Sequence, residues 1–301
     1  MEMVPENLPD KFTHTIIEMH TAEGAKWLTD LPQLIEEIQE NWSLKVAKPF
    51  PNLSYHFVAP CILENGSAAV LKIGFPQENS PIFNEAEMLK IFNGNGAAKM
   101  LRIDKTRYAL LIEKLTPGAH LKTVFRGNDA KAVEIAIQVL LKIWREPTPG
   151  HNFIPLENWF KVFDAAENTM FPSHAIRKAR DFYNELKGGQ KFLLHGDFHH
   201  ENILSAQREP FLVIDPKGII GEIGYEISVF LNNHVLWLSS APDVRKKLND
   251  AVSKFAEAFT VEPQILRKWA FAQAVLSAWW TFEDNGKNWE TDLELAKFWD
   301  R

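Results

Sequence analysis

The segment 195–218 contains the residues whose types and spacing best suit chemistry. Asp197 lies in a predicted loop, Asn202 follows five residues later at the start of a predicted strand, and Asp215 ends the strand paired with it. Because these strands are expected to form a hairpin, the three side chains would face one opening. Mg²⁺ prefers oxygen ligands and keeps waters and phosphates in its shell, so Asn202 and Asp215 would suffice as its protein ligands. Asp197 could then orient a substrate hydroxyl for in-line attack on a γ-phosphate.

A lysine and a glutamate earlier in the chain form a second candidate group. Lys72 lies within the apolar run Ala68–Ile73, and Glu85 lies at the start of the next predicted helix. An inward-pointing ammonium group needs a carboxylate partner, because burying an unpaired charge is costly. We therefore expect Lys72 to pair with Glu85, and such a pair can hold the α- and β-phosphates of a nucleotide. A surface lysine on an edge strand is the alternative for Lys72 taken alone.

The sequence around these residues resembles the aminoglycoside phosphotransferase family, which shares the protein-kinase-like fold. The pattern His-Gly-Asp-x-His-x-x-Asn occupies residues 195–202, and Ile-Asp-x-x-Gly occupies residues 214–218. With Val70–Gly74, these segments are most similar to the streptomycin-type and hydroxyurea-resistance branch, and the resemblance covers roughly residues 50–285. It implies an α+β, bilobal fold with a small antiparallel-sheet lobe and a mostly helical lobe.

The resemblance also implies a role for each residue. Asp197 would be the catalytic base, Asn202 and Asp215 the magnesium ligands, and Lys72 with Glu85 the phosphate-holding ion pair. The implied cofactors are ATP and Mg²⁺. The implied reaction is direct transfer of the γ-phosphoryl group to a hydroxyl of a small, polar and cationic acceptor, such as a streptomycin-like aminoglycoside.

Two further segments are expected to contact the nucleotide. By the resemblance, the connector Glu113, Lys114 and Leu115 would meet the adenine through its backbone. Protein kinases have a Gly-x-Gly-x-x-Gly loop before the lysine, but here the segment Asn52–His56 stands in that place. We expect the hydroxyl group of Ser54 to substitute for part of that loop's contact with the phosphates.

An aromatic and acidic group near the end of a predicted helix is the candidate acceptor site. It consists of Trp279, Trp280, Glu283 and Asp284, and residues 283–300 contain six acidic residues against two lysines. Carboxylates pair with ammonium or guanidinium groups, and aromatic ring faces attract cations. We therefore expect a cationic acceptor here. Core packing of the tryptophans and a solvated helix face for the acids are the alternatives.

The pattern of the whole chain favours two lobes joined by a short connector. Alternating residues from Ser54 to Ile73 predict two antiparallel strands, and residues 100–103 and 108–113 predict another pair. Thr116-Pro117-Gly118 interrupts this pattern. We predict an N-terminal lobe over residues 1–113, a connector over 114–118, and a C-terminal lobe over 119–301 with the catalytic loop and the acceptor site. Ligands commonly bind at such domain interfaces.

Helical periodicity dominates the rest of the chain, apart from a strand-rich segment at residues 192–215. In the N-terminal lobe it predicts a helix over residues 22–40, in which Pro32 should cause a break or turn, and another that opens near Asn84. In the C-terminal lobe the predicted helices cover residues 130–145, 157–169, 174–186, 225–239, 244–259 and 262–284.

Composition excludes several classes of protein. With 46% hydrophobic and 24% charged residues in a chain of 301, the protein is globular rather than disordered. Its single cysteine, Cys61, forbids an internal disulfide, and we expect a cytoplasmic location. A net charge of −6 without a basic stripe argues against a nucleic-acid partner. The longest apolar stretch, residues 269–282, is too short to cross a membrane.

Three other interpretations of the motifs remain open. The acceptor could be another small metabolite of the choline, homoserine, sugar or fructosamine type, because kinases of this fold act on those as well. The His and Asp residues of the segment 195–215 could instead be ligands in a metal-dependent hydrolase, but Asn202 and Lys72 would then have no role. A kinase-like binding protein without activity should lack the base or a metal ligand, and all three are present here.

Overall fold

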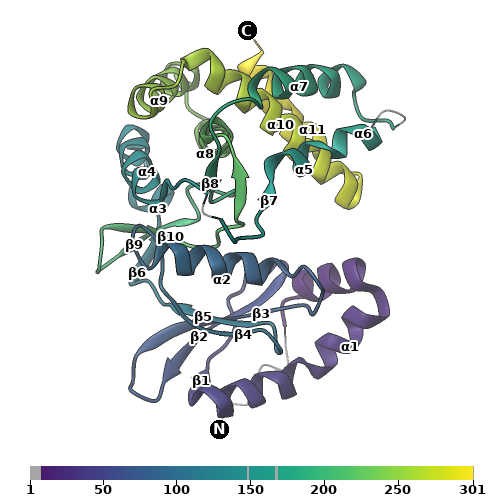
Figure 1. Cartoon of the computed structure of the whole chain (residues 1–301), viewed down its shortest axis with the longest axis vertical. Coiled ribbons are helices and arrows are strands. Elements are labelled where there is room, and N and C mark those ends of the chain that lie inside the picture. The colour runs from purple at the N-terminus through teal and green to yellow at the C-terminus, as the bar shows by residue number, and fades with distance from the viewer. Residues whose placement is uncertain (1–7, 148, 167–168, 301) are drawn as a thin grey trace. The chain divides into compact units, whose positions relative to one another are not determined.

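The computed structural model describes residues 8–147, 149–166 and 169–300 (Figure 1). The chain divides after Thr116 into two compact units. The first contains an antiparallel sheet with two helices, and the second is mostly helical. The predicted α+β class is therefore confirmed.

The first unit is built on a five-stranded antiparallel sheet with the strand order β1-β2-β3-β5-β4. Its elements are α1 (Asp10–Trp42), β1 (Leu44–Val46), β2 (His56–Leu63), β3 (Ala68–Gly74), α2 (Pro81–Phe92), β4 (Met100–Asp104) and β5 (Ala109–Glu113). A turn at residues 64–67 joins β2 to β3, with Gly66 at a φ of 80° and the Ser67 amide donating to Asn65 Oδ1. The two predicted strand pairs are confirmed.

The two helices of this unit lie on opposite faces of the sheet (Figure 1). Leu71 and Ile73 of β3 join the cluster of buried side chains that α1 covers. Because successive side chains of a strand point to opposite faces, Lys72 between them points to the other face. There it meets Glu85 of α2. The alternation of β3 thus directs the lysine to the helix that carries its partner.

Helix α1 differs from the helix predicted over residues 22–40 in two respects. It continues through Pro32, so the predicted break at that residue is wrong. A bend occurs instead at Thr21, whose φ of 52° and ψ of −128° are not helical. Buried residues on both sides of Pro32, including Leu31 and Ile35, pack on the sheet, and this packing outweighs the preference of proline for a helix end. Helix α2 begins earlier than predicted, with Pro81 in its first turn.

The second unit consists of helices around two small three-stranded sheets, ordered β10-β9-β6 and β7-β11-β8. Its strands are β6 (Pro117–His120), β7 (Ile154–Pro155), β8 (Phe192–Leu194), β9 (Ile203–Ala206), β10 (Phe211–Val213) and β11 (Ile219–Gly221). Its helices are α3 (Leu121–Val124), α4 (Asp129–Ile143), α5 (Leu156–Phe160), α6 (Val162–Ala165), α7 (Ser173–Leu186), α8 (Ile223–Leu238), α9 (Val244–Phe259), α10 (Pro263–Asn285) and α11 (Trp289–Trp299). Helix α8 is buried along most of its length, which makes it the core of this unit.

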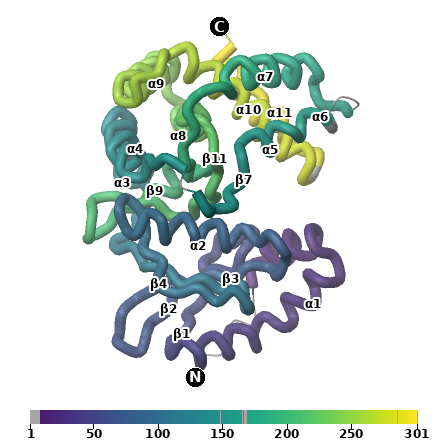
Figure 2. The backbone as a smooth tube through the Cα atoms, in the orientation of Figure 1, coloured from purple at the N-terminus to yellow at the C-terminus, as the bar shows by residue number. Residues whose placement is uncertain are grey.

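Most predicted helices of this unit are found within a few residues of their predicted bounds. The structure differs from the prediction at three segments. The helix predicted over residues 157–169 is divided between α5 and α6, and residues 167–168 lie outside the described part. Helix α11 was not predicted, because its segment is rich in acidic residues. It packs beside α10 (Figure 2). Pro117 and Gly118 of the predicted connector belong to β6, which pairs with β9.

Candidate active site

The loop between β8 and β9 holds the predicted base, Asp197. One oxygen of its carboxylate lies 3.4 Å from His199 Nε2. The other accepts a hydrogen bond of 3.1 Å from the side-chain amide of Asn202 and lies 3.7 Å from the ammonium group of Lys217. The carboxylate stays accessible, since 35% of the side chain is exposed. It is therefore an oriented anion that an incoming molecule can reach.

The hairpin of β9 and β10 brings Asn202 and Asp215 to the same end of the sheet. Asn202 immediately precedes β9, Asp215 follows β10 by two residues, and the amide of Ile214 between the strands' ends donates to the Asn202 carbonyl at 3.0 Å. The predicted hairpin is confirmed. Asp215 has a φ of 62°, a left-handed conformation that aspartate tolerates better than most residues. Its carboxylate lies 2.6 Å from Lys217 Nζ.

The donor set of these two residues fits a magnesium ion. The Asn202 amide nitrogen donates to both the backbone and the carboxylate of Asp197, at 2.8 and 3.1 Å, so its carbonyl oxygen is the atom it can offer to a cation. Asp215 adds a carboxylate that is already in ionic contact with a cationic side chain. An amide oxygen and a carboxylate suit Mg²⁺, which takes its remaining ligands from water and phosphate.

His195 stabilises the conformation of the loop between β8 and β9 through contacts of its ring. Its ring is buried, and burial lowers its pKa to about 4 despite the nearby Asp197, so the ring is neutral at pH 7. Nδ1 accepts the backbone amide of Asp197 at 3.2 Å, and Nε2 faces the Ile214 carbonyl at 2.9 Å. These contacts assign the proton to Nε2. The neutral ring thereby ties the catalytic loop to the segment that leads to Asp215.

The pKa of Asp197 keeps this carboxylate ionised. Burial alone would raise the pKa, but the hydrogen bond from His199 and the charges of His199, Lys217 and His195 lower it to about 2. Asp197 is therefore negatively charged at every pH at which the protein would be assayed. It can accept a hydrogen bond from a hydroxyl group and orient it, but it is a weak base in isolation.

Helix α8 anchors the catalytic loop at two places that the sequence analysis did not identify. Glu226, which is fully buried, accepts the backbone amide of Gly196 through both carboxylate oxygens, at 3.0 and 3.2 Å. About two helical turns further along α8, His234 Nδ1 lies 3.0 Å from Nε2 of the buried His200. An acidic residue within an apolar helix was the available signal, because a buried carboxylate needs donors.

Gly196 is required at its position for two reasons. Its φ of 83° disfavours other residues, and an added Cβ would lie 2.8 Å from Ile219 Cγ1 and 3.4 Å from Trp159 Cη2. The indole of Trp159, on α5, therefore lies directly beside the loop. The sequence analysis did not single out Trp159, because the chain between residues 159 and 196 gives no indication of this proximity.

The buried Glu226 should make stability depend on pH. Burial raises its pKa to about 8, from an ordinary value near 4.5, so the folded state holds a proton that the unfolded state releases between these values. Stability should accordingly be greatest below pH 4.5 with respect to this group and decline as the pH rises through 8. We expect the parent's melting temperature to fall between pH 5 and pH 8, and Glu226→Gln, which cannot ionise, to show a smaller fall.

Thermal unfolding monitored by circular dichroism over that pH range checks this expectation. The control is Glu283→Gln, which makes the same change at an exposed glutamate and should keep the parent's slope. An equal decline in parent and Glu226→Gln would contradict the assignment of the buried proton to this residue.

Within the first unit, Lys72 and Glu85 form the predicted ion pair. Nζ and Oε2 lie 2.5 Å apart, and the side chains are 7% and 3% exposed. β3 is flanked by β2 and β5, with Lys72 opposite Val58 and Leu110, so the alternative of an exposed edge-strand lysine is wrong. A buried pair of this kind is held in one geometry by its surroundings. Its role with phosphates stays a prediction.

The other predicted nucleotide residues lie at the ends of strands in the first unit. Ser54 is exposed in the bend that precedes β2. Glu113 ends β5, and one of its carboxylate oxygens accepts the Lys99 amide at 3.0 Å. Leu115 is buried in the segment that follows. The predicted contacts of these three residues with the nucleotide stay predictions.

The predicted acceptor residues do not form one exposed group. Trp279 is 2% exposed and packs edge-on against Phe171, which is the core-packing alternative. Trp280 is half-buried and meets Trp159 edge-to-face, with 5.2 Å between ring centroids. Glu283 and Asp284 are exposed one turn later.

The acidic segment around these residues is also more engaged than its composition suggests. Asp292 accepts a hydrogen bond from Thr281, Glu294 pairs with Lys297, and Asp300 pairs with Lys178. Of the predicted acceptor residues, Trp280 is therefore the one that Trp159 connects to the catalytic loop.

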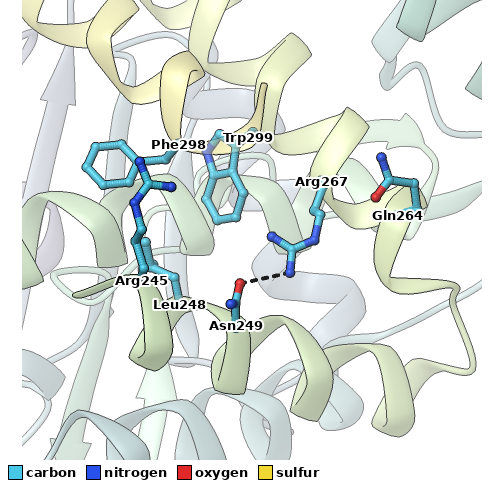
Figure 3. A pocket seen from close by; sticks show the side chains of 7 residues that line it. All are labelled: Arg245, Leu248, Asn249, Gln264, Arg267, Phe298 and Trp299. Atoms are coloured by element: carbon cyan, nitrogen blue, oxygen red, sulfur yellow. Dashed lines mark hydrogen bonds between the residues drawn. The ribbon is translucent and has the colours of Figure 1, made fainter. Parts of the chain in front are cut away.

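A separate cavity lies among α9, α10 and α11 (Figure 3). It has a volume of about 260 Å³ and is lined by Arg245, Leu248, Asn249, Gln264, Arg267, Phe298 and Trp299. The Arg267 guanidinium donates to Asn249, and the Arg245 guanidinium lies over the Phe298 ring (Figure 3). None of the predicted site residues lines it.

In residues 8–147, 149–166 and 169–300, no three His, Cys, Asp or Glu side chains form a ligand group. None of the helices that the structure describes combines the length and the apolar character needed to cross a membrane.

Comparison with known proteins gives consistent results. Residues 46–286 match the family described as aminoglycoside/hydroxyurea antibiotic resistance kinase. Streptomycin 6-kinase of Streptomyces griseus is 25% identical over 289 residues, which are 93% of this chain and 91% of that protein. Hydroxyurea phosphotransferase of Kitasatospora aureofaciens is 28% identical over 237 residues, 75% of this chain and 68% of that protein.

Among solved structures, choline kinase of Streptococcus pneumoniae is similar in fold. Its TM-score is 0.60 at 13% identity, with 89% of this chain and 98% of that chain covered. The predicted kinase-like fold is confirmed by this likeness, and the predicted branch is confirmed by the family match. The chain belongs to the aminoglycoside/hydroxyurea antibiotic resistance kinase family, and it is a small-molecule kinase.

Proposed function

We propose that this kinase transfers the γ-phosphoryl group of ATP, with Mg²⁺, to a hydroxyl group of a polar and cationic acceptor such as a streptomycin-like aminoglycoside. The observation that carries the proposal is the set of contacts around Asp197. Asn202 donates to this carboxylate at 3.1 Å, and Lys217 lies 3.7 Å from it and 2.6 Å from Asp215. One loop and one hairpin thus hold Asp197 in contact with Asn202 and Lys217, and Lys217 in contact with Asp215.

Asp197 orients the acceptor in this reaction. The acceptor hydroxyl donates its hydrogen bond to the carboxylate, and its oxygen attacks the γ-phosphorus in line with the leaving group. The new O–P bond forms, the bond between the γ-phosphorus and the bridging oxygen breaks, and ADP leaves with the electron pair. The hydroxyl proton passes to Asp197. A pKa of about 2 suits a loose transition state, in which the proton moves late and positioning matters more than basicity.

Asn202 and Asp215 would hold the magnesium ion through an amide oxygen and a carboxylate. When bound, Mg²⁺ neutralises negative charge on the phosphates. His195 keeps both ends of this arrangement in register, because its ring contacts the Asp197 amide and the Ile214 carbonyl at once. The hydrogen bonds from Asn202 to Asp197 keep the base next to the ligand.

The first unit would bind the rest of the nucleotide. Lys72, held by Glu85 at 2.5 Å, would contact the α- and β-phosphates through its ammonium group. Ser54 precedes β2 and would donate its hydroxyl to a phosphate oxygen, and the backbone at Glu113 and Leu115 would bind the adenine.

Trp159 and Trp280 would form an aromatic wall of the acceptor site. Both are half-buried, their rings are in edge-to-face contact, and Trp159 lies beside Gly196, the residue before the base. The exposed Glu283 and Asp284 follow Trp280 by one helical turn and would add negative charge for ammonium or guanidinium groups. Trp279 is buried in the core and is not part of this wall.

The acceptor preference can be measured with a panel of compounds. We expect ATP-dependent ADP release with streptomycin to exceed that with other aminoglycosides, hydroxyurea, choline and uncharged sugars. Trp280→Leu should raise the KM for the cationic acceptor about tenfold, because a cation–π contact and its packing are lost, while the KM for ATP stays the same. Trp42→Leu, at a half-buried tryptophan of the first unit, is the matched control.

Phosphorylation of an uncharged sugar in preference to every cationic compound would refute the cationic acceptor while leaving the kinase reaction intact. Equal KM values for the acceptor in the parent and in Trp280→Leu would remove this tryptophan from the acceptor site. Release of ADP with none of the compounds would count against the whole proposal.

A further inference from the structure

Lys217 is placed between the two carboxylates on which the proposed reaction depends. Its Nζ lies 2.6 Å from Asp215 Oδ2 and 3.7 Å from Asp197 Oδ2. The ammonium group therefore has ionic contacts with both the predicted base and a predicted magnesium ligand. The roles so far assigned to this site do not include Lys217.

The backbone holds Lys217 in this position. Its amide donates to the His195 carbonyl at 2.6 Å, which ties it to the strand that leads into the catalytic loop. Asp215 and Gly218 have positive φ values of 62° and 71°. Between them, the ring of Pro216 fixes the φ angle of that residue. This folded segment directs the side chains of residues 215 and 217 towards each other. The lysine is thus fixed at its base, while its long side chain can move at the tip.

The ion pair itself offers little stability. The side chains of Lys217, Asp215 and Asp197 are 34%, 30% and 35% exposed. Ion pairs that solvent reaches to this extent contribute little to the stability of the folded state. Stabilisation of the fold is therefore a poor explanation for the pair. A lysine whose charge stays accessible next to two carboxylates can instead bind a ligand.

The proposed function determines which ligand that is. Asp197 would contact the hydroxyl that attacks the γ-phosphorus, and Asp215 would help to hold the cation that neutralises charge on the phosphates. The group that lies between these two contacts during the reaction is the transferred phosphoryl group, which carries developing charge on its equatorial oxygens. An ammonium group held between Asp197 and Asp215 is consequently within reach of those oxygens.

We propose that Lys217 is a further catalytic residue, which contacts the transferred phosphoryl group and stabilises its charge in the transition state. This inference rests on the proposed function. Lys217 exchanges its contact with Asp215 for the phosphoryl oxygens when the carboxylate takes up its cation. Its partner changes while its backbone stays bonded to His195. The acceptor oxygen still forms the new bond to the γ-phosphorus, ADP still leaves with the electron pair of the broken bond, and the hydroxyl proton still passes to Asp197.

Lys217→Met tests the proposal, because it keeps the length of the side chain and removes the charge. At saturating ATP and acceptor, we expect the single-turnover rate of transfer to fall roughly 100-fold, as when a donor to a developing oxyanion is removed. Lys217→Arg should recover part of the rate because it restores a cationic donor. Mn²⁺ binding to the nucleotide-free enzyme, measured by electron paramagnetic resonance, should be as tight as in the parent or tighter, because the ammonium no longer competes for Asp215.

The matched control is Lys122→Met. Lys122 pairs with Glu201 of the same catalytic loop and is 41% exposed, so the change in charge is the same at a comparable site. We expect its transfer rate and Mn²⁺ affinity to stay within about twofold of the parent, as for a surface substitution. Circular dichroism of all variants establishes that they are folded.

Two results would overturn the proposal for Lys217 alone. One is an unchanged transfer rate in Lys217→Met when the parent is active. The other is a loss of Mn²⁺ affinity in Lys217→Met equal to its loss of rate, which would assign to Lys217 the role of positioning Asp215. A parent enzyme that transfers no phosphoryl group to any acceptor would overturn the proposed function and, with it, this inference.

Discussion

Asp197→Asn should lose roughly 10²–10⁴-fold in the rate of phosphoryl transfer, the range that a general base contributes. Asparagine has nearly the same shape and can still accept a hydrogen bond from Asn202, so the loop should keep its fold. It lacks the charge that attracts the acceptor hydroxyl and takes up its proton. Nucleotide binding should survive, because the lysine, the glutamate and the two magnesium ligands are unaltered.

Two measurements check this expectation. Steady-state ADP release in the presence of an acceptor reports the transfer, and isothermal titration calorimetry with a non-hydrolysable ATP analogue reports the binding. Asp181→Asn, at an exposed position of α7, provides the same substitution away from the site. Retention of more than a tenth of the parent's rate would exclude Asp197 as the base. The experiment also separates an enzyme from a binding protein, because a binding protein would show no transfer in the parent.

The pH dependence of transfer offers an independent view of the same residue. Since the pKa of Asp197 is lowered to about 2, the carboxylate is ionised throughout the range in which enzymes are assayed. A decline in activity towards pH 5 therefore has to come from another group or from the substrates. This follows from the contacts with His199 and Lys217, which stabilise the charged form.

The local arrangement of the site could be predicted because it is encoded in short stretches of sequence. Asp197, Asn202 and Asp215 lie on one loop and one hairpin, so their spacing along the chain nearly determines their spacing in the protein. The pairing of Lys72 with Glu85 could be predicted for a different reason. A lysine within a buried strand requires a carboxylate, and Glu85 lies on the next helix.

The residues that support the site could not be predicted in the same way. Glu226 and His234 approach the catalytic loop from α8, and Trp159 approaches it from α5, so their contacts depend on tertiary packing. Composition was misleading where local interactions decide the structure. The acidic segment after residue 284 was not predicted to be helical, but it forms helix α11, in which Asp292 accepts a hydrogen bond from Thr281. Likewise, packing on the sheet keeps α1 helical through Pro32.

Asp215→Asn should remove the dependence of nucleotide binding on the metal ion. Asparagine tolerates the left-handed backbone that this position requires, with a φ of 62°, so the substitution tests the charge rather than the fold. A neutral amide is a much weaker ligand for a divalent cation than a carboxylate. We therefore expect Mn²⁺ affinity to fall by at least tenfold and transfer to fall by about 10³-fold, because the phosphate charge is no longer neutralised.

The same variant also changes the surroundings of Lys217, because its 2.6 Å partner becomes neutral while the contact with Asp197 stays ionic. The two carboxylates of the site can thus be separated experimentally. Asp197→Asn should preserve Mn²⁺ binding and abolish transfer, whereas Asp215→Asn should weaken both. Asp250→Asn, on an exposed face of α9, controls for the loss of one negative charge. Electron paramagnetic resonance titrations with Mn²⁺ in the presence of an ATP analogue measure the difference, and equal Mn²⁺ affinities in the parent and Asp215→Asn would show that the cation binds elsewhere.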